Sequence, residues 1–172
     1  PTGRGAHTAA VVNDRIYVIC GSNADSWSRA DLGAGHLNSV EVFCLEQGEP
    51  PIDSDPTNQP SSVNIEIERF GDDICDGPED VAIDSEGNIY TGMHDGRILR
   101  FDQYVNNPEV VADTGGRPLG LEFDAYGNLI ICDAYKGLLS MNQVGDITVL
   151  TTECDGVPFK LTEDVDIAED GT

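Results

Sequence analysis

The sequence has 172 residues, of which 32 are Asp or Glu and 9 are Lys or Arg, so its net charge is -23. This length suits one domain or part of a larger one. So acidic a surface repels nucleic acids and anionic membranes and favours cations, which argues against a nucleic-acid-binding function.

No run of apolar residues approaches the roughly 18 that a membrane-spanning helix needs. The first residue is Pro1 rather than Met, so we expect any targeting segment to lie outside this sequence. The chain as given is expected to be soluble, and its compartment is left open.

The first strands of the chain are short and alternate between apolar and polar residues: "HTAAVV", "RIYVICG" and "NSVEVF". Asn13-Asp14 is expected to form the first turn between them. Residues 1–44 resemble one kelch repeat, with Cys20-Gly21 at the place where kelch repeats usually have two glycines. The resemblance predicts one blade of a β-propeller.

Three later segments align as a repeat: "EDVAIDSEGNIY" from Glu79, "LGLEFDAYGNLI" from Leu119 and "EDVDIAEDGT" from Glu163. Each is expected to form a strand, a tight turn and a second strand. The turns of the first two carry the Gly and Asn residues that positive φ angles require, at Glu86-Gly87 and Tyr126-Gly127.

Further short strands follow these hairpins, "RILRFD" and "PEVVAD" after the first, "GLLSMN" and "ITVLTT" after the second. Four strands in a repeat of about 40 to 45 residues are typical of a β-propeller blade. No amphipathic helical pattern is present, which excludes a helical solenoid. The sequence therefore predicts an all-β chain, a partial β-propeller made of four-stranded antiparallel blades. We expect the isolated chain not to close a ring.

Five motifs in the second part occur in order: "GPEDVAID", "YTGMHDGRI", "GRPLGLEFD", "DAYKGLL" and "GVPFKLTEDVDI". Together they make residues 65–172 resemble the strictosidine synthase-like family, which is related to the SMP-30/gluconolactonase propellers. The resemblance implies a six-bladed propeller with a metal, usually calcium, in its central channel. Six blades need roughly 250 residues, so we interpret this chain as a fragment.

The predicted organisation has three parts. Residues 1–45 form a kelch-like blade, and residues 46–62, rich in Pro, Asp and Ser, form a linker. Residues 63–172 form strictosidine synthase-like blades that are truncated at the C-terminus.

The family resemblance implies that Glu79, just before an innermost strand, points into the channel and binds the metal. Calcium takes six to eight oxygen ligands, and carboxylates supply them well. Glu163 stands where relatives often have Asn, and a carboxylate can replace that amide oxygen. Leu119, at the equivalent position between them, cannot coordinate a metal. We expect Ca²⁺ in the complete protein, with Glu79 and Glu163 as ligands. The alternative is that both acids cap turns or face solvent.

Four other residues are candidates for the rim of the channel: Asp80, Asp133, Tyr135 and Asp164. For Asp133 an equally good alternative is that it accepts hydrogen bonds from turn amides, while Tyr135 packs between blades. We expect Arg117 to pair with one of the many carboxylates. His94 is expected to be an exposed loop residue.

The remaining candidates are histidines and cysteines. His7 and His36 have no partner at metal-ligand spacing. The five cysteines contain no CxxC pair, which argues against a zinc site. Cys20 and Cys132 fall in apolar strand patterns and are expected to be small buried residues.

Two classes of function follow from these features. The first is a metal-dependent hydrolase of the lactonase or arylesterase type, acting on a small-molecule ester or lactone. The second is a non-catalytic propeller that binds a partner or acts as a scaffold, which the kelch-like start favours. Fold alone does not choose between them, because propellers have both roles. No catalytic residue is assigned from the sequence.

Overall fold

The structure is a computed structural model. It describes the strands at residues 9–12, 15–19, 40–45 and 65–70 and the continuous segment 74–168, with side chains from Phe70 onward. His7, His36, Cys20, the Asn13-Asp14 turn and the linker at 46–62 lie outside the described residues.

The described residues form strands and turns without a helix, as the sequence predicts. They make three four-stranded antiparallel sheets, each with its strands in chain order, and one short hairpin. The first sheet contains β1 (Ala9–Val12), β2 (Arg15–Ile19), β3 (Val40–Leu45) and β4 (Ile65–Phe70). The second contains β5 (Val81–Ile83), β6 (Ile89–Gly92), β7 (Arg97–Phe101) and β8 (Glu109–Asp113). The third contains β9 (Pro118–Phe123), β10 (Leu129–Asp133), β11 (Gly137–Met141) and β12 (Ile147–Thr151), and the hairpin contains β13 (Glu153–Cys154) and β14 (Val157–Pro158).

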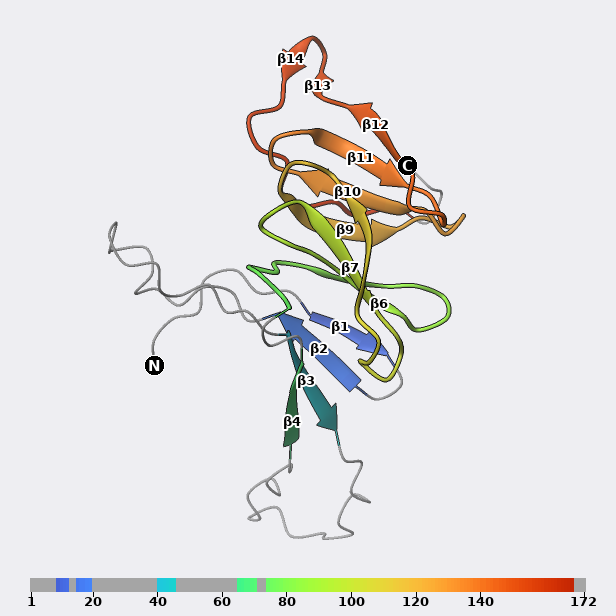
Figure 1. The fold of residues 1–172 in the computed structure, drawn as a ribbon. Helices are drawn as coiled ribbons and strands as arrows, with labels where there is room; N and C mark the ends of the chain where they lie inside the picture. Colours follow the sequence, from blue (N-terminus) through green and yellow to red (C-terminus); the bar gives the residue numbers. More distant parts are fainter. Residues whose placement is uncertain (1–8, 13–14, 20–39, 46–64, 71–73, 169–172) are drawn as a thin grey trace, which may run out of the picture.

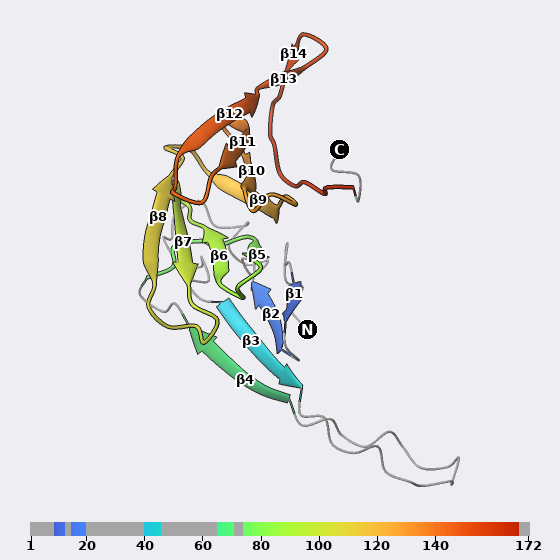
Figure 2. The same cartoon turned by 90° about the vertical axis from the view of Figure 1, so that its right-hand side faces the viewer.

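The three sheets are stacked face to face as the blades of a propeller (Figure 1). In Figure 2 they fan out as an arc, with β1, β5 and β9 on its concave side and β4, β8 and β12 on its convex side. β5 contacts β1 and β2 of the first blade and β9 of the third. The first strand of each blade therefore borders the channel, and the partial β-propeller expected from the sequence is confirmed.

The first blade combines strands from both parts of the predicted organisation. β4 pairs with β3 along its whole length, with Phe70 opposite Val40 and Ile65 opposite Leu45. β4 is thus the outermost strand of the sheet that starts with the kelch-like strands. The boundary drawn at residue 63 consequently separates strands that share one sheet.

The two predicted Gly turns are confirmed, and each has an aspartate as its anchor. Gly87 and Gly127 have φ angles of 86° and 80°, which favour glycine. In the first turn the Asp84 carboxylate accepts hydrogen bonds from the backbone N–H groups of Glu86 and Asn88, both at 2.9 Å. Asp124 does the same in the second turn, so each hairpin is closed by a side chain that the glycine pattern alone does not indicate.

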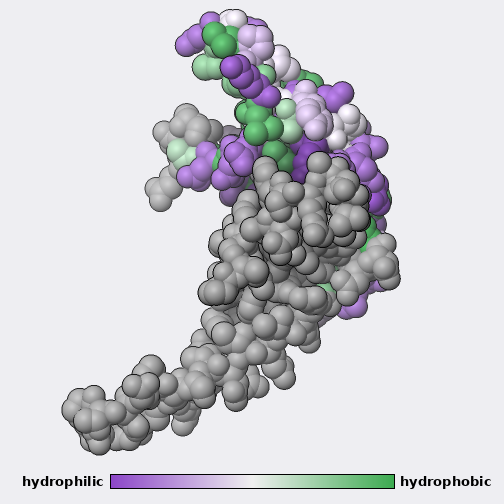
Figure 3. All heavy atoms as spheres, turned by 90° about the vertical axis from the view of Figure 1, so that its left-hand side faces the viewer, coloured by the Kyte–Doolittle hydropathy of each residue, from purple (hydrophilic) through white to green (hydrophobic). Residues whose placement is uncertain are grey.

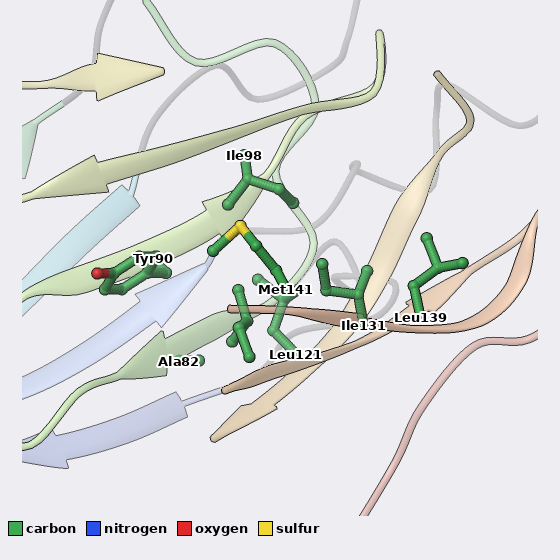
Figure 4. Close-up of a cluster of buried hydrophobic side chains, with 8 residues drawn as sticks. Ala82, Tyr90, Ile98, Leu121, Ile131, Leu139 and Met141 are labelled. Carbon is green, nitrogen blue, oxygen red and sulfur yellow. The ribbon is translucent and has the colours of Figure 1, made fainter. Parts of the chain in front are cut away.

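The second blade has an apolar core on each of its faces. One face packs Val81, Ile89, Met93, Leu99 and Phe101 toward Phe70 of the first blade. The other face packs against the third blade through the cluster shown in Figure 4: Ala82, Tyr90, Ile98, Leu121, Leu129, Ile131, Leu139 and Met141. Two edge-on aromatic contacts join the blades, Phe70 with Phe101 and Tyr90 with Phe123, at centroid distances of 5.1 and 5.0 Å.

The segment after β12 departs from the predicted pattern. The segment from Glu163 was expected to begin with a strand, but residues 163–168 form no strand. An innermost strand needs the second strand of its own blade as a ladder partner, and none is present among the described residues. Hydrophobic side chains are exposed in this C-terminal region, including Val149, Val157, Phe159 and Leu161. In Figure 3 hydrophobic atoms surface in the upper, C-terminal part of the described residues. The open arc fits a fragment.

Replacement of Ile131 tests the packing between the second and third blades. Ile131 is fully buried in the interblade cluster. Ile131→Ala is expected to lower the free energy of unfolding by about 2–5 kcal/mol, because it leaves a cavity between two rigid sheets. Urea denaturation measures the change. Val149→Ala, in the same blade but exposed, should cost less than about 0.5 kcal/mol; equal losses would contradict the assigned interface.

Candidate functional site

The first strands of adjacent blades begin at the same end of the channel, and Asp80 joins them. Its Oδ1 accepts a hydrogen bond from the N–H of Val81 at 2.7 Å, at the start of β5. Its Oδ2 accepts one from the N–H of Leu121 at 2.6 Å, in β9 of the next blade. A carboxylate that accepts hydrogen bonds from two backbone N–H groups is a charge-assisted link. Asp80 therefore fixes how β5 and β9 are positioned relative to each other along the channel.

Glu79 lies beside this link, and its side chain is 38% exposed. Its Oε1 accepts a hydrogen bond from a terminal nitrogen of Arg117, the residue before β9. The other terminal nitrogen of Arg117 contacts Nδ1 of His94, in the turn between β6 and β7. The expected pairing of Arg117 with a carboxylate is thereby confirmed, and three segments meet at this end of the channel.

Asp133 is fully buried at the end of β10. Its Oδ1 accepts from the N–H groups of Tyr135 and Lys136, and its Oδ2 accepts from the hydroxyl of Thr114 at 2.7 Å. The alternative role as acceptor of turn amides is therefore confirmed. Gly116 lies against this carboxylate: a Cβ there would come within 2.2 Å of Oδ1.

Tyr135 corrects the second half of that alternative. That alternative placed its ring between blades, but the side chain is 75% exposed. The turn after β10 directs Asp133 inward to the backbone amides and Tyr135 outward to solvent. Its position at the rim stays a prediction.

Glu163 and Asp164 are exposed and pass along the face of the third blade. Asp164 repeats the local bond of Asp80, since its Oδ1 accepts from the N–H of Val165 at 2.9 Å. Gly120 makes this passage possible, because a Cβ on it would come within 2.7 Å of the Glu163 carbonyl oxygen and the Asp164 Cα. The equivalent of Asp80 in the third blade is therefore a glycine, and the neighbouring backbone fills the space.

Two titrating groups show how close these acids lie to one another. Burial raises the pKa of the Cys132 thiol to about 11, and Asp164 and Asp80 add to the shift. Cys132 is 1% exposed, so its expected burial is confirmed. Burial also raises the pKa of Glu122, with further contributions from Asp166, Asp80 and Asp164. Negative charge from two segments therefore converges on the third blade.

The described residues do not by themselves fit a calcium ion. No group of three His, Cys, Asp or Glu side chains gathers within ligating reach in the part of the chain that the structure describes. Glu79 already neutralises the guanidinium of Arg117, and Leu119, the equivalent residue of the next blade, is buried and apolar. Calcium, with Glu79 and Glu163 as its ligands, stays a prediction for the complete protein.

A groove of about 890 Å³ lies at the other end of the second and third blades, among the turns that follow β5, β9 and β11. Tyr90 borders it, and its hydroxyl donates to Oδ2 of Asp84 at 3.3 Å. None of the predicted site residues lines this groove. The candidate site is therefore the opposite end, where Glu79, Arg117 and His94 meet.

Two sequence families match the chain. Residues 66–101 match the family described as "Strictosidine synthase-like, N-terminal", and residues 3–49 match the kelch motif. Strictosidine synthase-like protein 4 of Arabidopsis thaliana is 40% identical over an alignment of 151 residues; the match covers 78% of this chain and 41% of that protein. The strictosidine synthase-like resemblance of this chain is confirmed. An adipocyte plasma membrane-associated protein of Salmo salar is also similar, with 32% identity over 74% of the chain and 34% of that protein.

The chain thus spans about two fifths of the length of the curated relatives it matches. Among solved structures, a gluconolactonase from Xanthomonas campestris superposes with a TM-score of 0.58 at 18% identity, over 95% of this chain and 50% of the other. The major allergen Mala s 1 of Malassezia sympodialis superposes with a TM-score of 0.53 at 19% identity, over 81% and 45%. At these identities the likeness concerns the fold. Within the described residues, no helix has the length and hydropathy needed to span a bilayer.

Removal of the Asp133 carboxylate tests its structural role. Asp133→Ala removes the acceptor of the Tyr135 and Lys136 backbone N–H groups and one of two acceptors of the Thr114 hydroxyl, which also donates to the Gly96 carbonyl oxygen at 3.3 Å. The free energy of unfolding should fall by about 2–4 kcal/mol, since partly buried donors lose a carboxylate acceptor. Urea denaturation measures this, with Tyr135→Ala as the exposed control that should change it little. A neutral result for Asp133→Ala would contradict the assigned bonds.

The raised pKa of Glu122 predicts a pH dependence. A carboxyl with a higher pKa in the folded than in the unfolded chain binds its proton more tightly when folded. The contribution of Glu122 to stability should therefore decline as pH rises from the ordinary value of 4.5 through its folded pKa. Glu122→Gln should remove this decline and stabilise the chain at pH 7 by about 0.5 kcal/mol, because the group is largely exposed. Thermal melts between pH 4 and 8 measure it; a steeper decline in the variant would contradict the assignment.

Proposed function

We propose that the complete protein hydrolyses a small-molecule ester or lactone at the end of the channel where Glu79, Arg117 and His94 meet. The observation that supports this most directly is the ion pair of Arg117 with Glu79, which places a guanidinium at the start of the innermost strands. The propeller likeness to a gluconolactonase and the strictosidine synthase-like relatives is consistent with small-molecule chemistry. This proposal concerns the whole protein.

Hydrolysis needs a donor for the developing oxyanion and a base for the attacking water. Arg117 is the proposed donor, because its guanidinium is largely buried, always charged and rich in N–H groups. The proposed base is a carboxylate at the channel, such as the exposed Glu163. Water adds to the carbonyl carbon, the ester C–O bond breaks, and the leaving alkoxide takes a proton.

A binding or scaffolding propeller is the second candidate. It is favoured by the kelch match over residues 3–49. In this case the same end of the channel holds a ligand without converting it.

Hydrolysis by the full-length protein tests the proposal. Release of acid from a panel of aryl esters and aliphatic lactones is followed in a pH-stat, with calcium and with a chelator. Arg117→Gln should lower kcat/KM by about 10²-fold, the usual effect of losing an oxyanion donor. Arg100→Gln is the matched control, because Arg100 pairs with Glu109 between β7 and β8, away from this end. Absence of turnover above the blank by the unaltered protein would contradict the hydrolase and favour the binding module.

A further inference from the structure

Glu79 is paired with the cationic side chain of Arg117. This pairing affects which cation the propeller holds at its channel. We infer that Arg117 is the built-in counter-ion of Glu79 and supplies the positive charge that a bound metal ion would otherwise supply there. The inference rests on the contacts of Arg117 and does not depend on the proposed hydrolysis.

Arg117 reaches Glu79 from a backbone that is fixed on both sides. Its carbonyl oxygen accepts the N–H of Ala134 at 2.9 Å, which ties it to the end of β10. The next residue, Pro118, opens β9 with a restricted φ and packs against Gly92, where an added Cβ would lie 2.8 Å from its ring. The guanidinium is therefore delivered to Glu79 by rigid strands of two blades.

The partial burial of the pair makes the interaction stronger than that of a fully exposed ion pair. The Arg117 side chain is 14% exposed and that of Glu79 is 38% exposed. Removal from water strengthens the attraction between opposite charges and equally the repulsion between like charges. A divalent cation bound to the same carboxylate would lie within a few ångströms of the guanidinium. Calcium binding through Glu79 is thus opposed by Arg117.

His94 restrains the guanidinium from the other side. One terminal nitrogen of Arg117 contacts its Nδ1, and a guanidinium can only donate hydrogen bonds. Nδ1 must then be the unprotonated acceptor, and the ring proton lies on Nε2. The inference therefore includes a definite tautomer of His94, which is observable independently of any metal or activity.

Calorimetric titration of calcium into the full-length protein tests the inference. Arg117→Gln should bind calcium at least tenfold more tightly than the unaltered protein, because Glu79 loses its internal counter-ion. The double variant Arg117→Gln, Glu79→Gln should return to the starting affinity. Arg100→Gln makes the same change of net charge at the ion pair with Glu109. Its calcium affinity should stay within twofold of that of the unaltered protein. Arg117→Lys keeps the positive charge and should show no gain in calcium affinity.

Two results would overturn the inference. One is an Arg117→Gln affinity equal to that of Arg100→Gln, which would leave only the diffuse field of an acidic chain. The other is a tenfold loss of calcium affinity on Glu79→Gln in the otherwise unaltered protein, which would show that Glu79 binds calcium with Arg117 in place. ¹⁵N NMR of the unaltered protein needs no variant to fold: the His94 signals should show protonated Nε2 and should not move with calcium. The opposite tautomer, or a shift during the calcium titration, would also overturn it.

Discussion

The second blade is apolar on both faces, and the arrangement of the described residues depends on this constraint. Alternation along β5, β6 and β7 sends Val81, Ile89 and Leu99 to one side. Their neighbours Ala82, Tyr90 and Ile98 go to the other side. A sheet of this kind is stable only between two other sheets. Stacking on both faces aligns the first strands of successive blades along the channel, and the ends of those strands become the candidate site.

Much of the acidic chemistry at that end maintains the scaffold. The Asp80 carboxylate accepts hydrogen bonds from backbone N–H groups of two blades. The Asp133 carboxylate accepts them from a turn amide and from the Thr114 hydroxyl. Glycine at 116 gives the Asp133 carboxylate room, and glycine at 120 does the same for the passing backbone. An acidic residue at the mouth of a propeller strand is thus not by itself a metal ligand.

Glu79 differs from these two acids because its partner is a side chain of opposite charge. Arg117 and Glu79 form a nearly neutral pair within a chain of net charge -23. The pair joins a residue before β5 to a residue before β9, so it also links two blades. A substrate or ligand that approaches this end of the channel therefore meets a fixed guanidinium that is already paired within the protein.

The sequence by itself determined the strands, the blades and the Gly turns, because alternation and glycine at positive φ are local properties. The family resemblance singled out Glu79, whose role as a metal ligand stays a prediction, and the many acidic residues indicated that Arg117 would pair with a carboxylate. Which carboxylate Arg117 finds, and that Asp80 reaches Leu121, depended on blades packing side by side, which brings together residues about 40 positions apart. The same holds for β4, which reads as the start of the second part but pairs with β3. Tertiary structure decided these pairings because strand pattern fixes which face a residue occupies but not which strand lies opposite it.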